Sequence, residues 1–128
     1  DFMERGKILI IDDNEDDLKI TKELLEKVGY NVIENSGWLG STKNIKNFKP
    51  DIVLLDVNMP ALSGEKLYDL LENKLKKASI TVLLYSSLNE TYLKSLSLQK
   101  RLNYIPKGDI FQLYKKISFY MKKKRFTF

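Results

Sequence analysis

Cysteine and histidine are both absent from the 128-residue chain. Without cysteine there can be no disulfide, thiolate metal site or thiol nucleophile, and without histidine there is no imidazole for base catalysis or zinc binding. Long apolar runs are also missing, because runs such as Ile8–Ile11 and Ile52–Leu55 are far shorter than the roughly 18 residues that a membrane span needs. Any chemistry must therefore use carboxylates, hydroxyls and lysines. The N-terminal run is also too short for a secretory signal, so we expect a cytoplasmic chain without a membrane segment.

Basic residues outnumber acidic ones by 22 to 17, which gives a net charge of +5. Much of the excess lies near the C-terminus, in Lys115, Lys116 and the run Lys122–Arg125. Such a segment is compatible with nucleic acid or anionic lipid, but a lysine-rich last helical turn also complements the helix dipole and keeps the surface hydrated. We favour the second interpretation, so the charge alone assigns no partner.

Five short segments rich in Ile, Val and Leu have the composition of β-strands. Several are apolar without polar alternation, which is typical of strands that are covered on both faces in a parallel sheet. The predicted strands are Ile8–Ile11, Val32–Ile33, Ile52–Leu55, Ile80–Tyr85 and Tyr104–Ile105.

The segments between and after these strands have the spacing of amphipathic helices. In the third of them, Leu67 and Leu70 are predicted to share an apolar stripe, and Trp38, at the start of the second, is expected to pack. The predicted helices are Asn14–Val28, Trp38–Phe48, Gly64–Lys77, Glu90 to about Leu98, and Ile110 to about Lys123.

Strands and helices that alternate five times predict an α/β fold, because parallel strands need right-handed crossovers that place helices on both faces of the sheet. A barrel would need about twice this length. We predict a doubly wound, flavodoxin-like sheet of five parallel strands in the order 2-1-3-4-5. The chain of residues 1–128 is expected to be one domain, with its core at about 6–124 and a tail or linker at 125–128.

Polar residues follow the apolar strands where a doubly wound sheet places its site, outside the carboxyl ends of the strands. Asp12 and Asp13 follow the first strand, Asp56 the third, Ser86 the fourth and Lys107 the fifth. Three carboxylates at one edge repel one another unless a cation neutralises them. Oxygen ligands without histidine or cysteine suit a hard ion, and Mg²⁺ fits best.

These residue types also indicate a reaction. A carboxylate can attack phosphorus and form an acyl phosphate, and Asp56 is the best nucleophile because it ends a buried strand and precedes the turn at Val57–Pro60. The metal and Lys107 would offset the charge on the phosphoryl oxygens, and Ser86 could donate a hydrogen bond to one of them.

The motifs Ile8–Glu15, Leu54–Pro60, Ser86 and Tyr104–Lys107, in this order and at this spacing, resemble those of the response-regulator receiver family of two-component signalling. The resemblance extends over nearly the whole chain. It implies that the chain catalyses its own phosphorylation and slow dephosphorylation, and that it is not a conventional enzyme.

The resemblance further implies that Asp56 accepts a phosphoryl group from a phosphohistidine of a sensor histidine kinase or a phosphotransfer protein. Asp13 and Asp56 would bind Mg²⁺ directly, the backbone carbonyl of Asn58 would be a third protein ligand, and Asp12 would act through water. Lys107 would pair with the phosphoryl group.

Switching is also implied by the resemblance. Ser86 would move toward the phosphate and Tyr104 would turn inward, which would alter the surface formed by the fourth helix, the fifth strand and the fifth helix. That surface would then bind a second copy or a downstream effector. Nucleic acid would be contacted only through an output domain that the sequence does not contain.

Some residues depart from the family pattern. The family's lysine is usually followed by a cis-proline, whereas Lys107 is followed by Gly108, so the loop either is trans or holds strain. An alternative function is therefore an atypical receiver that binds proteins without phosphorylation. A phosphate-ester hydrolase is a second alternative, but it would need a general acid at Asn58.

Each site residue also has a purely structural interpretation. Asp12 and Asp13 could cap the first helix, and Ser86 could be a turn residue. Lys107 could be a solvated lysine and Tyr104 a core aromatic.

Overall fold

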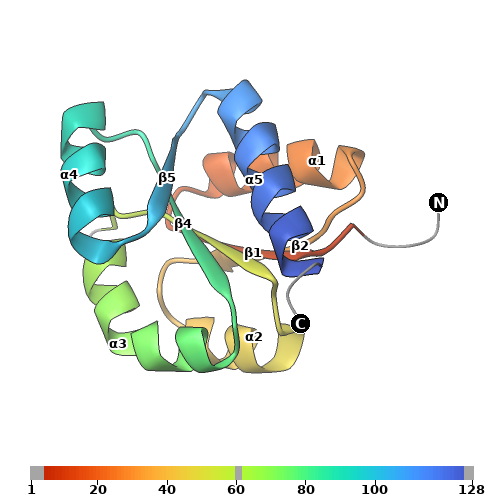
Figure 1. The fold of residues 1–128 in the computed structure, drawn as a ribbon, viewed down its shortest axis with the longest axis horizontal. Helices are drawn as coiled ribbons and strands as arrows, with labels where there is room; N and C mark the ends of the chain where they lie inside the picture. Colours follow the sequence, from red (N-terminus) through yellow and green to blue (C-terminus); the bar gives the residue numbers. More distant parts are fainter. Residues whose placement is uncertain (1–4, 60–61, 126–128) are drawn as a thin grey trace.

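The computed structural model describes residues 5–59 and 62–125. These residues form five strands and five helices that alternate along the chain, as predicted (Figure 1). The strands are β1 (Lys7–Asp12), β2 (Asn31–Ser36), β3 (Ile52–Leu55), β4 (Thr81–Ser86) and β5 (Asn103–Pro106). The helices are α1 (Glu15–Lys27), α2 (Ser41–Phe48), α3 (Gly64–Lys77), α4 (Glu90–Lys100) and α5 (Ile110–Arg125).

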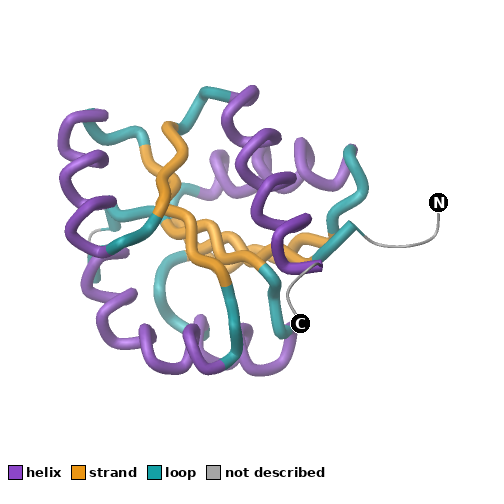
Figure 2. The backbone as a smooth tube through the Cα atoms, viewed as in Figure 1, coloured by secondary structure: helices purple, strands orange, loops and turns teal. Residues whose placement is uncertain are grey.

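The strands form one parallel sheet in the order β2-β1-β3-β4-β5, which confirms the predicted fold. Figure 2 shows the sheet as a central twisted layer with helices on both sides. Helices α1 and α5 cover one face, and α2 and α3 lie against the other. Strand β3 is apolar and fully buried because it lies at the centre of this sandwich.

Side chains alternate between the two faces along each strand and so form separate cores. Ile8 and Ile10 of β1 pack with the residues of α1 and α5, and Leu9 and Ile11 pack with those of α2 and α3. A third cluster, under α4, contains Leu84, Leu93 and Leu96. The strands are thus held from both sides, which fixes the position of the residues at their ends.

Helix α1 begins at a cap made by Asn14, whose side chain accepts a hydrogen bond from the backbone of Asp17 at 3.0 Å. The capping role that Asp12 and Asp13 could have had therefore belongs to Asn14. Asp12 is the last residue of β1, and its Oδ1 accepts a hydrogen bond from the Asn14 N–H at 2.9 Å.

Two helix predictions were wrong in detail. Helix α2 begins at Ser41 because Gly40 before it has a left-handed backbone with φ +83°, so Trp38 lies in a loop and is 41% exposed. In α3 the buried stripe includes Leu67 and Tyr68, whereas Leu70 is 73% exposed. The buried stripe is thus displaced toward Tyr68 and away from Leu70.

The last helix, α5, continues to Arg125, slightly beyond its predicted end. Residues 126–128 of the predicted tail lie outside the described residues, so the domain boundary stays a prediction. Among the described helices, none combines the length and the hydropathy that crossing a bilayer requires.

Candidate functional site

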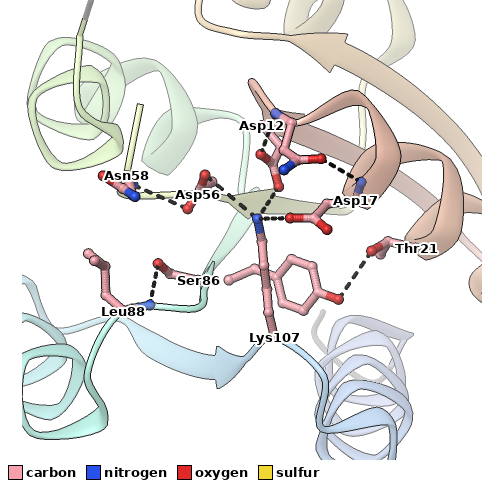
Figure 3. Close-up of polar contacts among 10 residues, drawn as sticks. Asp12, Asp17, Thr21, Asp56, Asn58, Ser86, Leu88 and Lys107 are labelled. Atoms are coloured by element: carbon pink, nitrogen blue, oxygen red, sulfur yellow. Dashed lines mark hydrogen bonds and ion pairs between the residues drawn. The ribbon is translucent and has the colours of Figure 1, made fainter. Parts of the chain in front are cut away.

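The predicted site residues lie at one edge of the sheet, where the parallel strands end. β1 ends at Asp12, Asp56 follows β3 directly, β4 ends at Ser86 and Lys107 follows β5 directly. Figure 3 shows Asp12, Asp56 and Lys107 pointing toward one another across this edge. Register and topology therefore bring together residues that are up to 95 positions apart in the chain (107 minus 12).

Asp12, Asp13 and Asp56 form an acidic cluster in which one carboxylate oxygen of each lies within 4.8 Å of those of the other two. Asp12 and Asp56 are buried, and Asp13 is exposed. The buried Oδ2 of Asp12 accepts no well-directed hydrogen bond, although it forms an ion pair with Lys107. An all-oxygen cluster with an under-coordinated buried oxygen fits a hard cation such as Mg²⁺.

Lys107 lies among three carboxylates. Its Nζ is 2.6 Å from Asp12 Oδ2, 2.9 Å from Asp17 Oδ2 and 3.7 Å from Asp56 Oδ2. Burial opposes the charged ammonium, but the close contacts with Asp12 and Asp17 and the nearby charge of Asp56 outweigh it and raise the pKa of Lys107. The side chain is therefore a permanent cation at this edge.

Groups around the Asp56 carboxyl act on its pKa in opposite directions. Burial, together with the charge of Asp12, raises its pKa from 3.8 to about 6, although the Asn58 N–H bond and the charge of Lys107 act in the other direction. The Asn58 N–H donates to Asp56 Oδ1 at 3.1 Å, and the Asp56 N–H donates to the Ile11 carbonyl at 2.9 Å. Asp56 is thus oriented by two backbone groups and destabilised as an anion by burial.

The start of α3 packs directly on the backbone of Asp56. A Cβ atom at Gly64 would lie 2.0 Å from the Asp56 carbonyl oxygen and 2.9 Å from the Cα of Val57, which are distances that no side chain tolerates. Gly64 also donates its N–H to the Val57 carbonyl at 3.3 Å. Glycine at this position lets the helix approach the strand end that carries Asp56.

Ser86 and Tyr104 lie at different places. Ser86 is buried at the edge, and its Oγ accepts a hydrogen bond from the Leu88 N–H at 3.2 Å (Figure 3). Tyr104 is half-buried, and its hydroxyl donates to Glu90 of α4 at 2.9 Å while the Lys116 ammonium lies 4.7 Å from its ring centroid. Tyr104 is therefore held by α4 and α5 and not by the acidic cluster.

The loop after β5 reaches the site without a cis peptide, since the described residues contain none. The Lys107 N–H donates to the Ser86 carbonyl at 2.9 Å, and Gly108 adopts a left-handed backbone with φ +89°. Of the two geometries considered for this loop, the trans form is therefore the one found.

The structure adds one site residue that the sequence analysis missed. Asp17 lies in the first turn of α1, and its Oδ2 accepts a hydrogen bond from Lys107 at 2.9 Å (Figure 3). Asp13 precedes the Asn14 cap of α1, so helical spacing does not relate it to Asp17 and the sequence pattern gave no signal for this contact. One turn further along α1, Thr21 shares a buried hydrogen bond of 3.1 Å with the Tyr85 hydroxyl.

A hollow of about 540 Å³ lies at the opposite end of the sheet. Ile45, Lys49, Asp51, Lys74 and Lys124 are among the residues that line it. None of the residues of the acidic cluster takes part, so this hollow is separate from the site at the carboxyl edge.

Comparison with known proteins gives one family. Residues 8–117 match the response regulator receiver domain. The chain is 32% identical over 93 residues, 73% of its length and 38% of the relative's, to the alkaline phosphatase synthesis transcriptional regulatory protein PhoP of Bacillus subtilis. It is 32% identical over 57 residues, 44% of its length and 46% of the relative's, to the polar-differentiation response regulator DivK of Brucella anthropi.

The matched regions cover less than half of the length of these two relatives. Among solved structures, a CheY-like response regulator receiver domain protein of Methanospirillum hungatei superposes with a TM-score of 0.79 at 25% identity. That match covers 94% of this chain and 96% of the other. The receiver domain of Francisella response regulator 1452 superposes with a TM-score of 0.80 at 22% identity, which covers 93% and 98% of the two chains and supports the fold.

The match to residues 8–117, the strand order and the aspartates at the strand ends agree with one another. The chain belongs to the response regulator receiver domain family of two-component signalling.

Proposed function

We propose that Asp56 accepts a phosphoryl group from the phosphohistidine of a sensor histidine kinase or phosphotransfer protein. The observation that supports this most directly is the meeting of Asp56 with Asp12, Asp13 and Lys107 at the carboxyl edge of the sheet. In the transfer, an Asp56 oxygen attacks phosphorus and the P–N bond breaks. Its electron pair stays on the donor imidazole, and the product is an acyl phosphate on Asp56.

Asp12, Asp13 and Asp56, with the Asn58 carbonyl, would hold Mg²⁺, which when bound neutralises charge on the phosphoryl oxygens. Lys107 is a fixed cation beside Asp56 at 3.7 Å and would pair with the phosphoryl group. The Asn58 N–H orients the nucleophilic carboxylate, since it donates to Asp56 Oδ1. Ser86, buried at the same edge, would donate its hydroxyl to a phosphoryl oxygen after releasing the Leu88 N–H.

Hydrolysis of phosphate esters is a poor alternative for this site. Such a reaction needs an acid to protonate the leaving alkoxide, and the position two residues after Asp56 is occupied by Asn58. Asn58 also offers no base that could activate a water against the acyl phosphate, which should therefore hydrolyse slowly. We expect no turnover of a generic phosphomonoester.

Output would pass through the surface of α4, β5 and α5. Tyr104 lies in β5 and contacts Glu90 of α4 and Lys116 of α5, so its rotation would disturb all three elements at once. A second copy of the chain or a downstream effector would bind there. We place the protein in the cytoplasm as a single receiver domain, with any contact to nucleic acid made by a separate output domain.

The test is incubation with a small phosphodonor such as phosphoramidate and Mg²⁺, followed by intact mass measurement. We expect a gain of about 80 Da, one phosphoryl group, in the parent and none in Asp56→Asn. Asp51→Asn is the matched control, because Asp51 lies at the other end of β3 and should leave the gain unchanged. No gain in the parent, with beryllofluoride also failing to bind, would favour a receiver that binds its partner without phosphorylation.

A further inference from the structure

Asp17 contacts Lys107, the cation beside the acidic cluster, but has none of the roles assigned above. Its Oδ2 accepts a hydrogen bond from Lys107 Nζ at 2.9 Å, and Asp12 Oδ2 lies 2.6 Å from the same nitrogen. An ammonium has three N–H donors. The hydrogen bond to Asp17 therefore occupies one of the three donors, and the ion pair with Asp12 holds the ammonium beside a second carboxylate.

Lys107 therefore retains an N–H donor for a further acceptor at the site. Asp56 Oδ2 is 3.7 Å from Lys107 Nζ, which is beyond the distance of a hydrogen bond. Figure 3 shows the ammonium between Asp12 and Asp17 on one side and Asp56 on the other. With the ammonium held by Asp17 and Asp12, a remaining N–H can be directed toward an oxygen of a group attached to Asp56.

Asp17 is itself held in place by the site. Its backbone N–H is bonded to the Asn14 side chain at 3.0 Å, and the Asn14 N–H is bonded to Asp12 Oδ1 at 2.9 Å. The first turn of α1 is thus tied to the same aspartate that pairs with Lys107. One turn later, the Thr21 hydroxyl bond to Tyr85 fixes the helix against β4.

The lysine needs such an anchor. Lys107 is followed by Gly108, which has a left-handed conformation. A glycine gives the backbone after Lys107 more freedom than another residue would allow. A lysine side chain also loses considerable rotamer entropy when it is fixed in one geometry. A second carboxylate on a capped helix restricts the ammonium before the phosphoryl group arrives.

We infer that Asp17 is a positioning residue for the phosphoryl transfer. Its hydrogen bond and the ion pair with Asp12 restrain the Lys107 ammonium, so that a remaining N–H of Lys107 is directed at the phosphoryl oxygen on Asp56. This inference rests on the proposed function, because it concerns the same reaction. Asp17 touches Lys107 and not the reacting atoms.

The experiment compares Asp17→Ala, which removes both the charge and the acceptor, with Asp17→Asn, which removes the charge but keeps an acceptor oxygen. Asp16→Ala is the matched control, because Asp16 is exposed in the same helical turn. The affinity for beryllofluoride and the rate of phosphorylation by phosphoramidate are measured at saturating Mg²⁺. We expect Asp17→Ala to lose about tenfold in both, and Asp17→Asn and Asp16→Ala to stay within about threefold of the parent.

A second readout needs no metal and no phosphoryl group. In a double-mutant cycle of urea unfolding, Asp17→Ala and Lys107→Ala should be coupled, and Asp16→Ala and Lys107→Ala should be additive. This readout shows whether Asp17 holds Lys107 in solution and is independent of reactivity.

The outcomes separate the two hypotheses. Unchanged beryllofluoride affinity in Asp17→Ala, or tighter binding in both Asp17 variants, would overturn the positioning role while leaving the proposed function intact. Tighter binding in both Asp17 variants would mean that the charge of Asp17 only repels the phosphoryl group. If the parent itself takes up neither beryllofluoride nor a phosphoryl group, the proposed function fails and the inference fails with it, even where the unfolding cycle shows coupling.

Discussion

The two ends of the sheet are built from the same residue types and differ in how the charges are placed. At the carboxyl end, Asp12 and Asp56 are buried around Lys107. At the amino end, Lys49 and Lys74 are exposed around an apolar hollow of about 540 Å³. Lys49 and Lys74 at the amino end are exposed to water, whereas Asp12 and Asp56 at the carboxyl end are buried. The buried charges, not the volume, locate the reactive site.

The largest effect should follow from removing Lys107. In Lys107→Ala the buried carboxylate of Asp12 loses its cation, and we expect the metal-free protein to lose about 3 kcal/mol of unfolding free energy, measured in urea. Lys124→Ala at the amino end should cost less than about 1 kcal/mol, because burial already lowers the pKa of that lysine. Equal losses of unfolding free energy in Lys107→Ala and Lys124→Ala would contradict the difference between the two ends of the sheet.

Asp56→Asn should stabilise the metal-free protein by up to about 3 kcal/mol above pH 6. The pKa of Asp56 is raised from 3.8 to about 6 in the folded protein, so its ionised form costs folding free energy. That cost is complete above pH 6, falls as the pH drops from 6 to 3.8 and is absent below 3.8. The stability of the parent relative to the variant should therefore decrease as the pH rises through this window.

Urea unfolding with a chelator present, at several pH values, measures this difference. Saturating Mg²⁺ should shrink it, because a bound cation favours the ionised carboxylate of the parent. A pH-independent difference, or a less stable Asp56→Asn, would show that burial does not strain this carboxylate.

Asp13→Asn should weaken Mg²⁺ binding by at least about tenfold. A tenfold loss of affinity corresponds to about 1.4 kcal/mol. A pair of unit charges at 4 Å contributes roughly 4 kcal/mol at an effective dielectric constant of about 20, so a tenfold loss is a lower bound. Isothermal titration provides the measurement. Asp51→Asn at the amino end should bind Mg²⁺ as the parent does, and a similar loss in that variant would indicate a nonspecific effect of net charge.

The smallest effect is expected for Ser86→Ala. The variant loses the acceptor for the Leu88 N–H, which should cost about 1 kcal/mol of unfolding free energy. Ser87→Ala is the control, because the neighbouring Ser87 is exposed and should tolerate the change. Comparable melting curves for the two variants would mean that the buried hydroxyl contributes nothing to this edge.

The fold and much of the site could be predicted from the sequence. Apolar strands such as Ile52–Leu55 are recognisable because burial on both faces removes the polar alternation. A parallel sheet then brings its strand ends together, so the sequence alone predicts Asp12, Asp56 and Lys107 at one edge.

What could not be predicted depends on side-chain direction. The bond from Lys107 to Asp17 joins residues 90 positions apart and requires one choice among many lysine rotamers. The exposed Leu70 is a related case, because the buried face of α3 is centred between Leu71 and Tyr68 and leaves Leu70 on its far flank. Apolar spacing alone does not show whether the buried stripe includes Leu70 or Tyr68.

The loop after β2 gives the chain a built-in optical probe. Trp38 is its single tryptophan and is 41% exposed, and the neighbouring Gly37 donates its N–H to the Asp12 carbonyl at 2.8 Å. A shift of the Asp12 backbone is thereby passed to the peptide next to the indole. Indole emission should consequently follow events at the acidic edge in the unlabelled protein, where no second tryptophan contributes background.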